Sequence, residues 1–321
     1  MERPKNRASK VCLALGSGAA KGISHIGVLT VLDEIGIKPD IITGTSIGAL
    51  IGALYAGGMK GKEIQELTLG IDKKEIKKLF KVTLDGPGFI NGQFIDEYIN
   101  DILPVKNIQD LKLPFSCCAC NIIDGREIIF SKGSLSDAVR ASISIPGILT
   151  PHKVEEYTLV DGGLVNPVPV SLCKKLGADF IIAVNVLNNP ILKNKIYNFP
   201  DRVREIQDKS SLKCAENLNK KIKLFIAREI ENLELTAKRL GSFLSLNEEL
   251  NILDIISQTY LIGESNLSKF RLSTDNPDIL IEPNMRSIRH FDFNKVQEAI
   301  LLGEKETWKV AAQNKNMSNI Q

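Results

Sequence analysis

Residues 41–50 read IITGTSIGAL, and this stretch decides the fold. Ile41 and Ile42 begin an apolar run typical of a buried strand, and the residues after Ser46 continue as an apolar segment typical of a helix. Gly44 and Gly48 flank Ser46 in the pattern G-x-S-x-G. Glycines allow the backbone to turn sharply, so the sequence predicts a strand, a tight turn and a helix, with the serine hydroxyl exposed at the turn.

Two plainer interpretations of this region compete with that prediction. Residues 41–59 are almost free of charge and in that respect mimic a membrane span. Their five glycines and interspersed hydroxyl residues favour a strand, a turn and a helix over one continuous apolar helix. Ser46 is also compatible with a purely structural role as the N-cap of the helix.

The same alternation continues outward and predicts a layered α/β fold. Residues 11–15 form a short apolar run before a glycine, and residues 21–35 carry a helical apolar stripe closed by Gly36. We expect further strands at 115–123, 127–130, 158–160, 180–186 and 278–281, a turn at 124–125, and helices at 135–142 and 294–309.

The domain organisation predicted from composition is one catalytic domain with an insertion. We expect a flexible tail at 1–9, a domain at 10–310 and a C-terminal tail at 311–321. The segment at about 190–246 is rich in Lys, Glu and Asn and has a helical pattern, with an apolar face over 218–233. A helix packed on the domain is the favoured interpretation, and a lid or membrane-surface helix is the alternative.

Composition is that of an ordinary globular protein. The 321 residues are 43% hydrophobic and carry a net charge of +3, which is too weak to indicate a nucleic-acid partner. The N-terminus lacks the apolar stretch of a secretory signal, so we expect a cytoplasmic protein. Of the six cysteines, Cys117, Cys118 and Cys120 share one expected strand, and no pair of CxxC motifs builds a zinc site. We therefore predict reduced, structural thiols.

A glycine-rich loop lies between the first strand and the first helix. Residues 16–22 read GSGAAKG, and backbone amides at such a loop can bind the oxyanion that forms during acyl transfer. A nucleotide-phosphate loop is the competing interpretation. However, G-x-G-x-x-G would require glycine in place of Lys21, no ribose-binding acid ends the second strand, and the loop is no Walker A motif. We expect no nucleotide.

A nucleophilic serine needs a base, and the chain has only three histidines. His25 lies within the first expected helix, where a structural role is favoured. His290 follows Ser46 and Asp161 in the order of an α/β-hydrolase triad, so it stays a candidate. Asp161 is the simpler partner, because its two following glycines permit close approach of another loop. An ordinary Asp-Gly turn is the alternative.

Four segments occur in an order that resembles the patatin-like phospholipase family, particularly its compact bacterial members. They are LGSGAAKG at 15–22 continuing into SHIGVL at 24–29, GTSIG at 44–48, ASISIP at 141–146, and DGG at 161–163. The resemblance covers residues 10–186 well and 278–304 more weakly. An ordered set over more than half of the chain is far more specific than any single motif.

The resemblance implies a three-layer α/β/α fold with a central, mostly parallel sheet, and hydrolysis of lipid acyl esters by a Ser–Asp dyad without a catalytic histidine, metal or other cofactor. Ser46 would be the nucleophile and Asp161 the base. The oxyanion hole would use amides of Ser17, Gly18 and Ala19, with Gly18 and Ala19 preferred. The chain departs from the family pattern at Ser17 and Ala19, where glycines are usual, and at Lys21, where arginine is usual. The supporting glycines would be Gly16, Gly22, Gly44, Gly48, Gly162 and Gly163.

The expected function is therefore a serine acyl hydrolase of phospholipase A, lysophospholipase or carboxylesterase type. Its partner would be a lipid or another acyl ester, with peripheral contact to a membrane surface. A non-catalytic lipid-binding or regulatory protein with the same fold is the alternative, and a nucleotide-binding α/β protein is a third hypothesis. Labelling of Ser46 by a fluorophosphonate distinguishes the enzyme from both.

Overall fold

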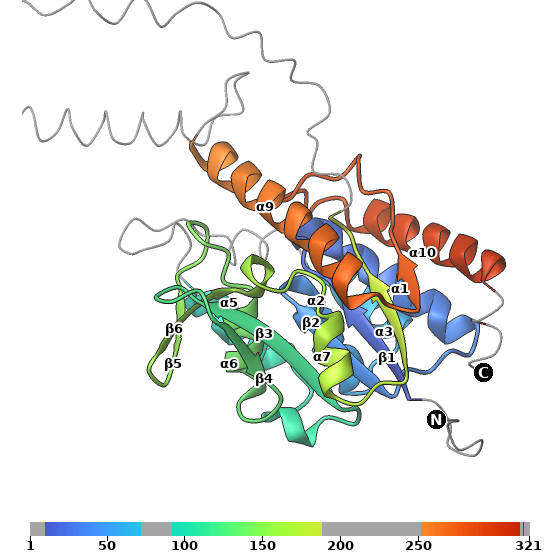
Figure 1. The fold of residues 1–321 in the computed structure, drawn as a ribbon, viewed down its shortest axis with the longest axis horizontal. Helices are drawn as coiled ribbons and strands as arrows, with labels where there is room; N and C mark the ends of the chain where they lie inside the picture. The colour runs from blue at the N-terminus through green and yellow to red at the C-terminus, as the bar shows by residue number, and fades with distance from the viewer. Residues whose placement is uncertain (1–9, 72–91, 188–251, 315–316, 318–321) are drawn as a thin grey trace, which may run out of the picture. The chain divides into compact units, whose positions relative to one another are not determined.

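The computed structural model describes residues 10–71, 92–187, 252–314 and 317 (Figure 1). Contacts divide the chain into two units, one made of residues 1–191 and 258–321 and the other of residues 192–257. The elements described below belong to the first unit, apart from the first residues of α9. The tail expected at 1–9 and the helical insertion expected at about 190–246, with its apolar face over 218–233, lie outside the described residues.

One eight-stranded sheet forms the centre of the first unit, in the order β5-β6-β3-β2-β1-β7-β8, with β4 paired to β3. Strands β3, β2, β1, β7 and β8 are parallel to one another. At the other end of the sheet, β4 and β6 pair antiparallel with β3, and β5 pairs antiparallel with β6. The strands are β1 (Val11–Leu15), β2 (Ile41–Thr45), β3 (Phe115–Asn121), β4 (Glu127–Phe130), β5 (His152–Val154), β6 (Tyr157–Asp161), β7 (Phe180–Val184) and β8 (Ile279–Ile281).

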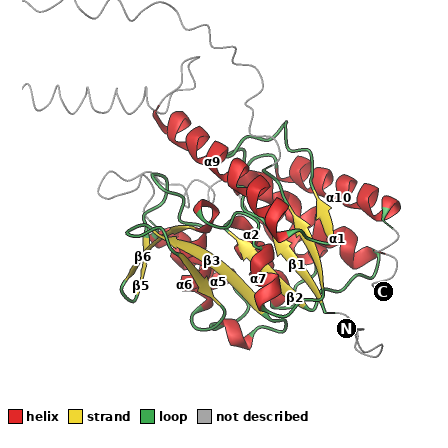
Figure 2. Ribbon diagram, in the orientation of Figure 1, coloured by secondary structure: helices red, strands yellow, loops and turns green. Residues whose placement is uncertain are grey.

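Helices cover both faces of this sheet (Figures 1 and 2). On one face α1 packs against α3 and α10, and α2 packs against α3 and α6, which contacts α5. The other face carries α7 and α9. The helices are α1 (Ser24–Glu34), α2 (Ile47–Ala56), α3 (Gly61–Gly70), α5 (Gln93–Ile102), α6 (Leu135–Ser142), α7 (Val170–Lys175), α9 (Ile252–Asp275) and α10 (Val296–Gln313), with short 3-10 turns η1 (Ala19–Ile23), η2 (Ile108–Asp110) and η3 (Gly162–Leu164).

Side chains of β1 alternate between the two helical layers. Cys12 and Ala14 join a buried cluster with α7 and with Leu272 of α9, whereas Leu15 faces Gly52 of α2. Because successive residues of a strand point to opposite faces, a fully apolar strand is what a sheet covered on both sides requires. The predicted three-layer α/β/α arrangement is confirmed.

Most predicted elements form within a few residues of their expected bounds. The helix expected at 21–35 begins as the 3-10 turn η1 and continues as α1, and Gly36 ends it with a φ of 80°. Residues 41–59 divide into β2, a turn and α2, as predicted. In the described part of the chain, no helix is both long enough and apolar enough to cross a membrane. α10 continues to Gln313, past the domain end expected at 310.

The structure joins Cys12 of β1 and Cys173 of α7 in a disulfide, so the prediction that all six cysteines are reduced was wrong for this pair. Both side chains lie in the cluster between the sheet and α7. A sequence separation of 161 residues hid this proximity, which depends on the parallel crossover. Cys117, Cys118 and Cys120 are buried free thiols, as expected, and Cys214 lies outside the described residues.

Candidate active site

Ser46 occupies a sharp turn between β2 and α2. Its backbone adopts φ 56° and ψ −126°, a conformation that is strained for a residue with a side chain and is typical of a nucleophile elbow. The turn places Ser46 at the N-terminus of α2, where the helix dipole favours negative charge. A Cβ atom on Gly44 would overlap the carbonyl of Gly48, and one on Gly48 would overlap the carbonyl of Leu15. Both glycines are therefore required by the tight packing of the turn.

This packing yields a stability prediction. Gly44→Ala should lower the free energy of unfolding by about 2 kcal/mol or more, because the new methyl group meets fixed backbone atoms. Urea unfolding followed by circular dichroism measures the change. Gly263→Ala is the matched control: it lies within α9 with open space around it, and alanine should raise helix stability by about 0.5–1 kcal/mol. Equal unfolding midpoints for Gly44→Ala and the wild type would contradict this interpretation of the elbow.

Ser46 and Asp161 form a buried pair. The Ser46 hydroxyl donates a hydrogen bond of 2.6 Å to Oδ2 of Asp161, and the two residues are only 3% and 1% exposed. Strand register explains why these two side chains, 115 residues apart in the sequence, lie close together. Thr45 of β2 lies opposite Cys118 of β3, and Asp161 of β6 lies opposite Ala119, so the serine and the aspartate flank the same point of β3.

The C-terminal end of α6 and the residues that follow it hold both members of the pair. The backbone amide of Ser46 donates to Oγ of Ser142 at 2.9 Å, and the amide of Asp161 donates to the carbonyl of Ser144 at 2.8 Å. Arg140, which is buried, donates to Oγ of Ser144 and to Asp96. The sequence analysis identified a motif at 141–146, but its hydrogen bonds to Ser46 and Asp161 were not predicted.

Asp161 has the properties of a base. Its other oxygen, Oδ1, accepts a 2.8 Å hydrogen bond from the amide of Gly163. Burial raises the pKa of Asp161 to about 6, while the hydrogen bonds from Ser46 and Gly163 and the nearby Tyr260 hydroxyl oppose that rise. A carboxylate with this pKa is ionised at neutral pH and still basic enough to accept a proton.

The glycine-rich loop presents two unused amides beside Ser46. The amide of Ser17 donates to the carbonyl of Pro167 at 2.8 Å, and that of Ala20 donates to the carbonyl of His290 at 3.1 Å. Within the described residues, the amides of Gly18 and Ala19 have no acceptor. Gly18 and Ala19 adopt φ values of 150° and 47°, which turn the chain at this point. The oxyanion-hole candidates thus narrow to Gly18 and Ala19, because the Ser17 amide is already bonded.

The remaining motif glycines allow the loops to meet. The amide of Gly16 bonds to the carbonyl of Val184 in β7. A Cβ atom on Gly22 would overlap the side chain of Ile47, the residue after Ser46. A Cβ atom on Gly162 would overlap the carbonyl of Cys118, and one on Gly163 would overlap the carboxyl group of Glu264.

None of the three histidines, all within the described residues, hydrogen-bonds to Ser46 or Asp161. His25 contacts the carbonyl of Gly16 through Nε2 at 2.7 Å, and burial lowers its pKa to about 4, so it holds the loop as a neutral donor. His152 pairs with Asp137 at 2.8 Å. His290 is buried, its pKa is lowered to about 3 by burial and by Lys21, and neither ring nitrogen has a partner among the described residues. His290 is therefore not the third member of a triad.

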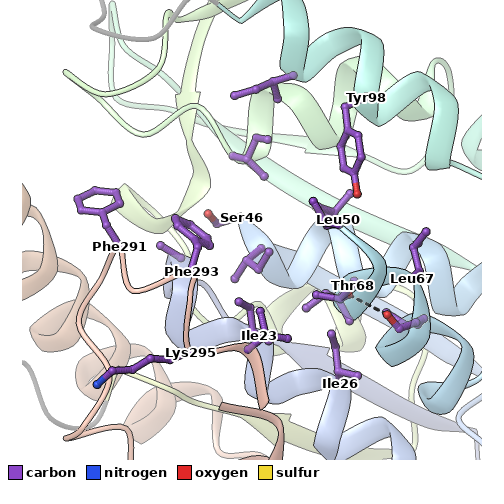
Figure 3. A pocket seen from close by; sticks show the side chains of 18 of the residues that line it. Ile23, Ile26, Ser46, Leu50, Leu67, Thr68, Tyr98, Phe291, Phe293 and Lys295 are labelled. Atoms are coloured by element: carbon purple, nitrogen blue, oxygen red, sulfur yellow. Dashed lines mark hydrogen bonds between the residues drawn. The ribbon is translucent and has the colours of Figure 1, made fainter. Parts of the chain in front are cut away.

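Ser46 opens into an apolar cavity of about 680 Å³ (Figure 3). The walls come from α2, α3, α5, residues 143–149 and the segment 291–298. Ala19 and Ser46 both line the cavity, so the candidate nucleophile and a candidate oxyanion-hole residue border the same space. Side chains of aliphatic and aromatic type dominate, among them Ile23, Leu50, Leu67, Ile95, Ile145 and Phe293. A cavity of this kind suits a hydrocarbon chain whose polar end stops at the serine.

The α/β/α sandwich and its serine elbow place the protein in a known family. The family model described as patatin-like phospholipase matches residues 13–174, about half of the chain, and this range contains both Ser46 and Asp161. The chain therefore belongs to the patatin-like phospholipase family.

Sequence relatives support this assignment. An uncharacterized NTE family protein of Mycobacterium tuberculosis is 34% identical over 177 residues, which are 55% of this chain and 49% of the relative. A lysophospholipase NTE1 of Candida albicans is 36% identical over 184 residues, 55% of this chain and 13% of the relative. The human patatin-like phospholipase domain-containing protein 6 is 33% identical over 181 residues, 55% of this chain and 13% of the relative.

The matched region thus covers at most about half of these relatives. Among solved structures, VipD from Legionella pneumophila is similar with a TM-score of 0.48 and 15% sequence identity, over 96% of this chain and 67% of that one.

Proposed function

We propose that the protein is a serine acyl hydrolase that cleaves lipid acyl esters through Ser46 and Asp161. The observation that carries this proposal is the 2.6 Å hydrogen bond between the two side chains at the wall of an apolar cavity. Family membership and relatives named lysophospholipases support a lipid substrate. Phospholipase A, lysophospholipase and carboxylesterase activities share this chemistry.

In the first half of the reaction, Ser46 Oγ attacks the ester carbonyl carbon while its proton passes to Asp161 Oδ2. The carbonyl oxygen becomes an oxyanion, and the amides of Gly18 and Ala19 donate hydrogen bonds to it. The positive end of α2 adds to this stabilisation. When the tetrahedral intermediate collapses, the C–O bond to the leaving alcohol breaks and Asp161 returns the proton to that oxygen. An acyl-enzyme on Ser46 remains.

In the second half, a water molecule takes the place of the alcohol. Asp161 accepts its proton as the oxygen attacks the acyl carbon, and the same two amides stabilise the second oxyanion. Collapse breaks the bond to Ser46, whose Oγ recovers the proton from Asp161. The products are a carboxylic acid and the free enzyme.

This mechanism gives a pH prediction. Only the ionised form of Asp161 can accept the serine proton, and its pKa is raised to about 6. The value of kcat/KM should therefore fall about tenfold per pH unit below about pH 6 and level off between about pH 6 and neutrality. Steady-state hydrolysis of a short-chain nitrophenyl ester across the acidic range measures this limb. A profile that stays flat to pH values well below the Asp161 pKa would rule out this residue as the base.

The substrate class is tested by measuring fatty-acid release from lysophosphatidylcholine micelles, diacyl phosphatidylcholine vesicles and a water-soluble nitrophenyl butyrate. The apolar cavity predicts faster turnover of the long-chain lipids per enzyme. Phe291 lines the cavity and is 40% exposed (Figure 3), and this exposed aromatic side chain supports the proposal of contact with a lipid surface. Tight vesicle binding without release of fatty acid from any substrate would instead support the non-catalytic lipid-binding alternative.

A further inference from the structure

A second buried acid lies beside the dyad. Glu264 of α9 is 3% exposed, and its Oε1 accepts a 2.9 Å hydrogen bond from Oγ of Ser17, across 247 residues of sequence. Its Oε2 is buried and has no hydrogen-bond partner among the described residues. The mechanism above does not use this group.

The carboxyl group of Glu264 reaches two catalytic loops at once. Through Ser17 it contacts the loop whose next residues, Gly18 and Ala19, present the free amides. Its Oε1 also occupies the space that a Cβ atom at position 163 would need, so only glycine fits at this position beside Glu264. The amide of Gly163 in turn donates to Oδ1 of Asp161.

We propose that Glu264 is a positioning residue that fixes the oxyanion-hole loop relative to the loop of the catalytic base. This inference rests on the proposed hydrolase function and deepens it. The Ser17 amide is bonded to Pro167, and the Ser17 hydroxyl is bonded to Glu264, so the residue before the oxyanion hole is held at both its backbone and its side chain. A displacement of such donors by about 1 Å can reduce a rate about 100-fold.

The charge of Glu264 matters because Asp161 shares its surroundings. The groups that act on Glu264 are Asp161 at the end of β6, Tyr260 one turn earlier on α9, and Lys21 on η1, which is itself buried. The Tyr260 hydroxyl faces both carboxyl groups without a hydrogen bond of standard geometry. His290, packed near the Tyr260 ring and under the influence of Lys21, is neutral.

Burial, reinforced by the negative charge of Asp161, raises the pKa of Glu264 to about 8, although Ser17, Tyr260 and Lys21 oppose the rise. Glu264 is then protonated at neutral pH, and Asp161 holds the only negative charge of the pair. Ionisation of Glu264 would place a second negative charge beside the base and near the developing oxyanion. Activity should therefore decrease as the pH rises through about 8, with Glu264 as the group responsible.

The test compares Glu264→Gln and Glu264→Leu in the full-length protein. Glutamine keeps an oxygen that accepts from Ser17 and cannot ionise, whereas leucine has a similar size and accepts nothing. We expect Glu264→Gln to retain kcat at neutral pH within about threefold and to lose the alkaline decrease, and Glu264→Leu to lose about 30–100-fold in kcat with a smaller change in KM. Lys269→Leu, at an exposed position of α9, is the control and should match the wild type.

Ser17→Ala provides a second line of evidence that does not depend on a buried acid being replaced. If Glu264 acts through Ser17, the losses from Ser17→Ala and Glu264→Leu should not add in the double variant. Additive losses, or an alkaline decrease that persists in Glu264→Gln, would overturn the proposal. So would wild-type kcat in a folded Glu264→Leu. Absence of Ser46-dependent hydrolysis in the wild type is a separate outcome, because it would overturn the proposed function itself and this inference with it.

Discussion

Replacing Ser46 by alanine is expected to reduce ester hydrolysis at least about 1000-fold, because the nucleophile of both half-reactions is lost. The fold should persist. Alanine is smaller than serine and removes only the hydroxyl, so the elbow keeps its backbone bonds to Ser142 and to the first turn of α2. Fatty-acid release and nitrophenyl ester turnover measure the loss, and circular dichroism checks the fold.

Ser273→Ala is the matched control for this variant. Ser273 is exposed on α9, and its hydroxyl donates only to the carbonyl of Phe270. It should keep wild-type turnover. If Ser46→Ala retained more than about a tenth of the wild-type rate while folded, the nucleophile would have to be another group.

Asp161→Asn should reduce kcat by at least about 1000-fold while leaving the protein equally or more stable at neutral pH. The amide cannot accept the serine proton. Its oxygen can still accept from Gly163, and its NH₂ group can donate to Ser46, so the local hydrogen bonds are replaced and not deleted.

The stability half of this prediction follows from the direction of the pKa shift. Burial raises the pKa of Asp161 above its unfolded value, to about 6. The folded state therefore binds this proton more tightly than the unfolded chain, and the resulting stabilisation is present in acid and is lost as pH rises through about 6. Above that pH the buried charge is a cost to folding, which neutral asparagine removes. Urea unfolding at neutral pH tests this, and a marked loss of stability would show that Asp161 is mainly structural.

Much of the fold could be predicted from the sequence because a sheet covered on both faces needs uninterrupted apolar strands. The segments at 11–15 and 180–184 are of this kind, the segment at 41–45 begins with two isoleucines, and glycines mark several of the turns that follow. The start of the first helix was predicted less well, because its first residues form a 3-10 turn, in which Gly22 packs closely against Ile47.

Ser46 and Asp161 could be named from the sequence because the glycines around each report a backbone constraint. The residues that support this pair are not flanked by a comparable sequence pattern. Ser142 accepts through its side-chain hydroxyl and Ser144 through its backbone carbonyl, and no feature of the sequence distinguishes these two serines from others in the chain. The Glu264 contact and the cysteine pair join β1 or the loop after it to helices far along the chain. In a helical pattern, an acidic residue such as Glu264 is ordinarily assigned to a solvated face.

The most direct test of the central claim is the detection of the acyl-enzyme. The protein is mixed with a nitrophenyl ester, quenched in acid within the first turnovers, digested and examined by peptide mass spectrometry. We expect the mass of the acyl group on Ser46 in the wild type, and no acylated peptide in Ser46→Ala. Rapid turnover with Ser46 unmodified, or acylation at a different residue, would contradict the mechanism.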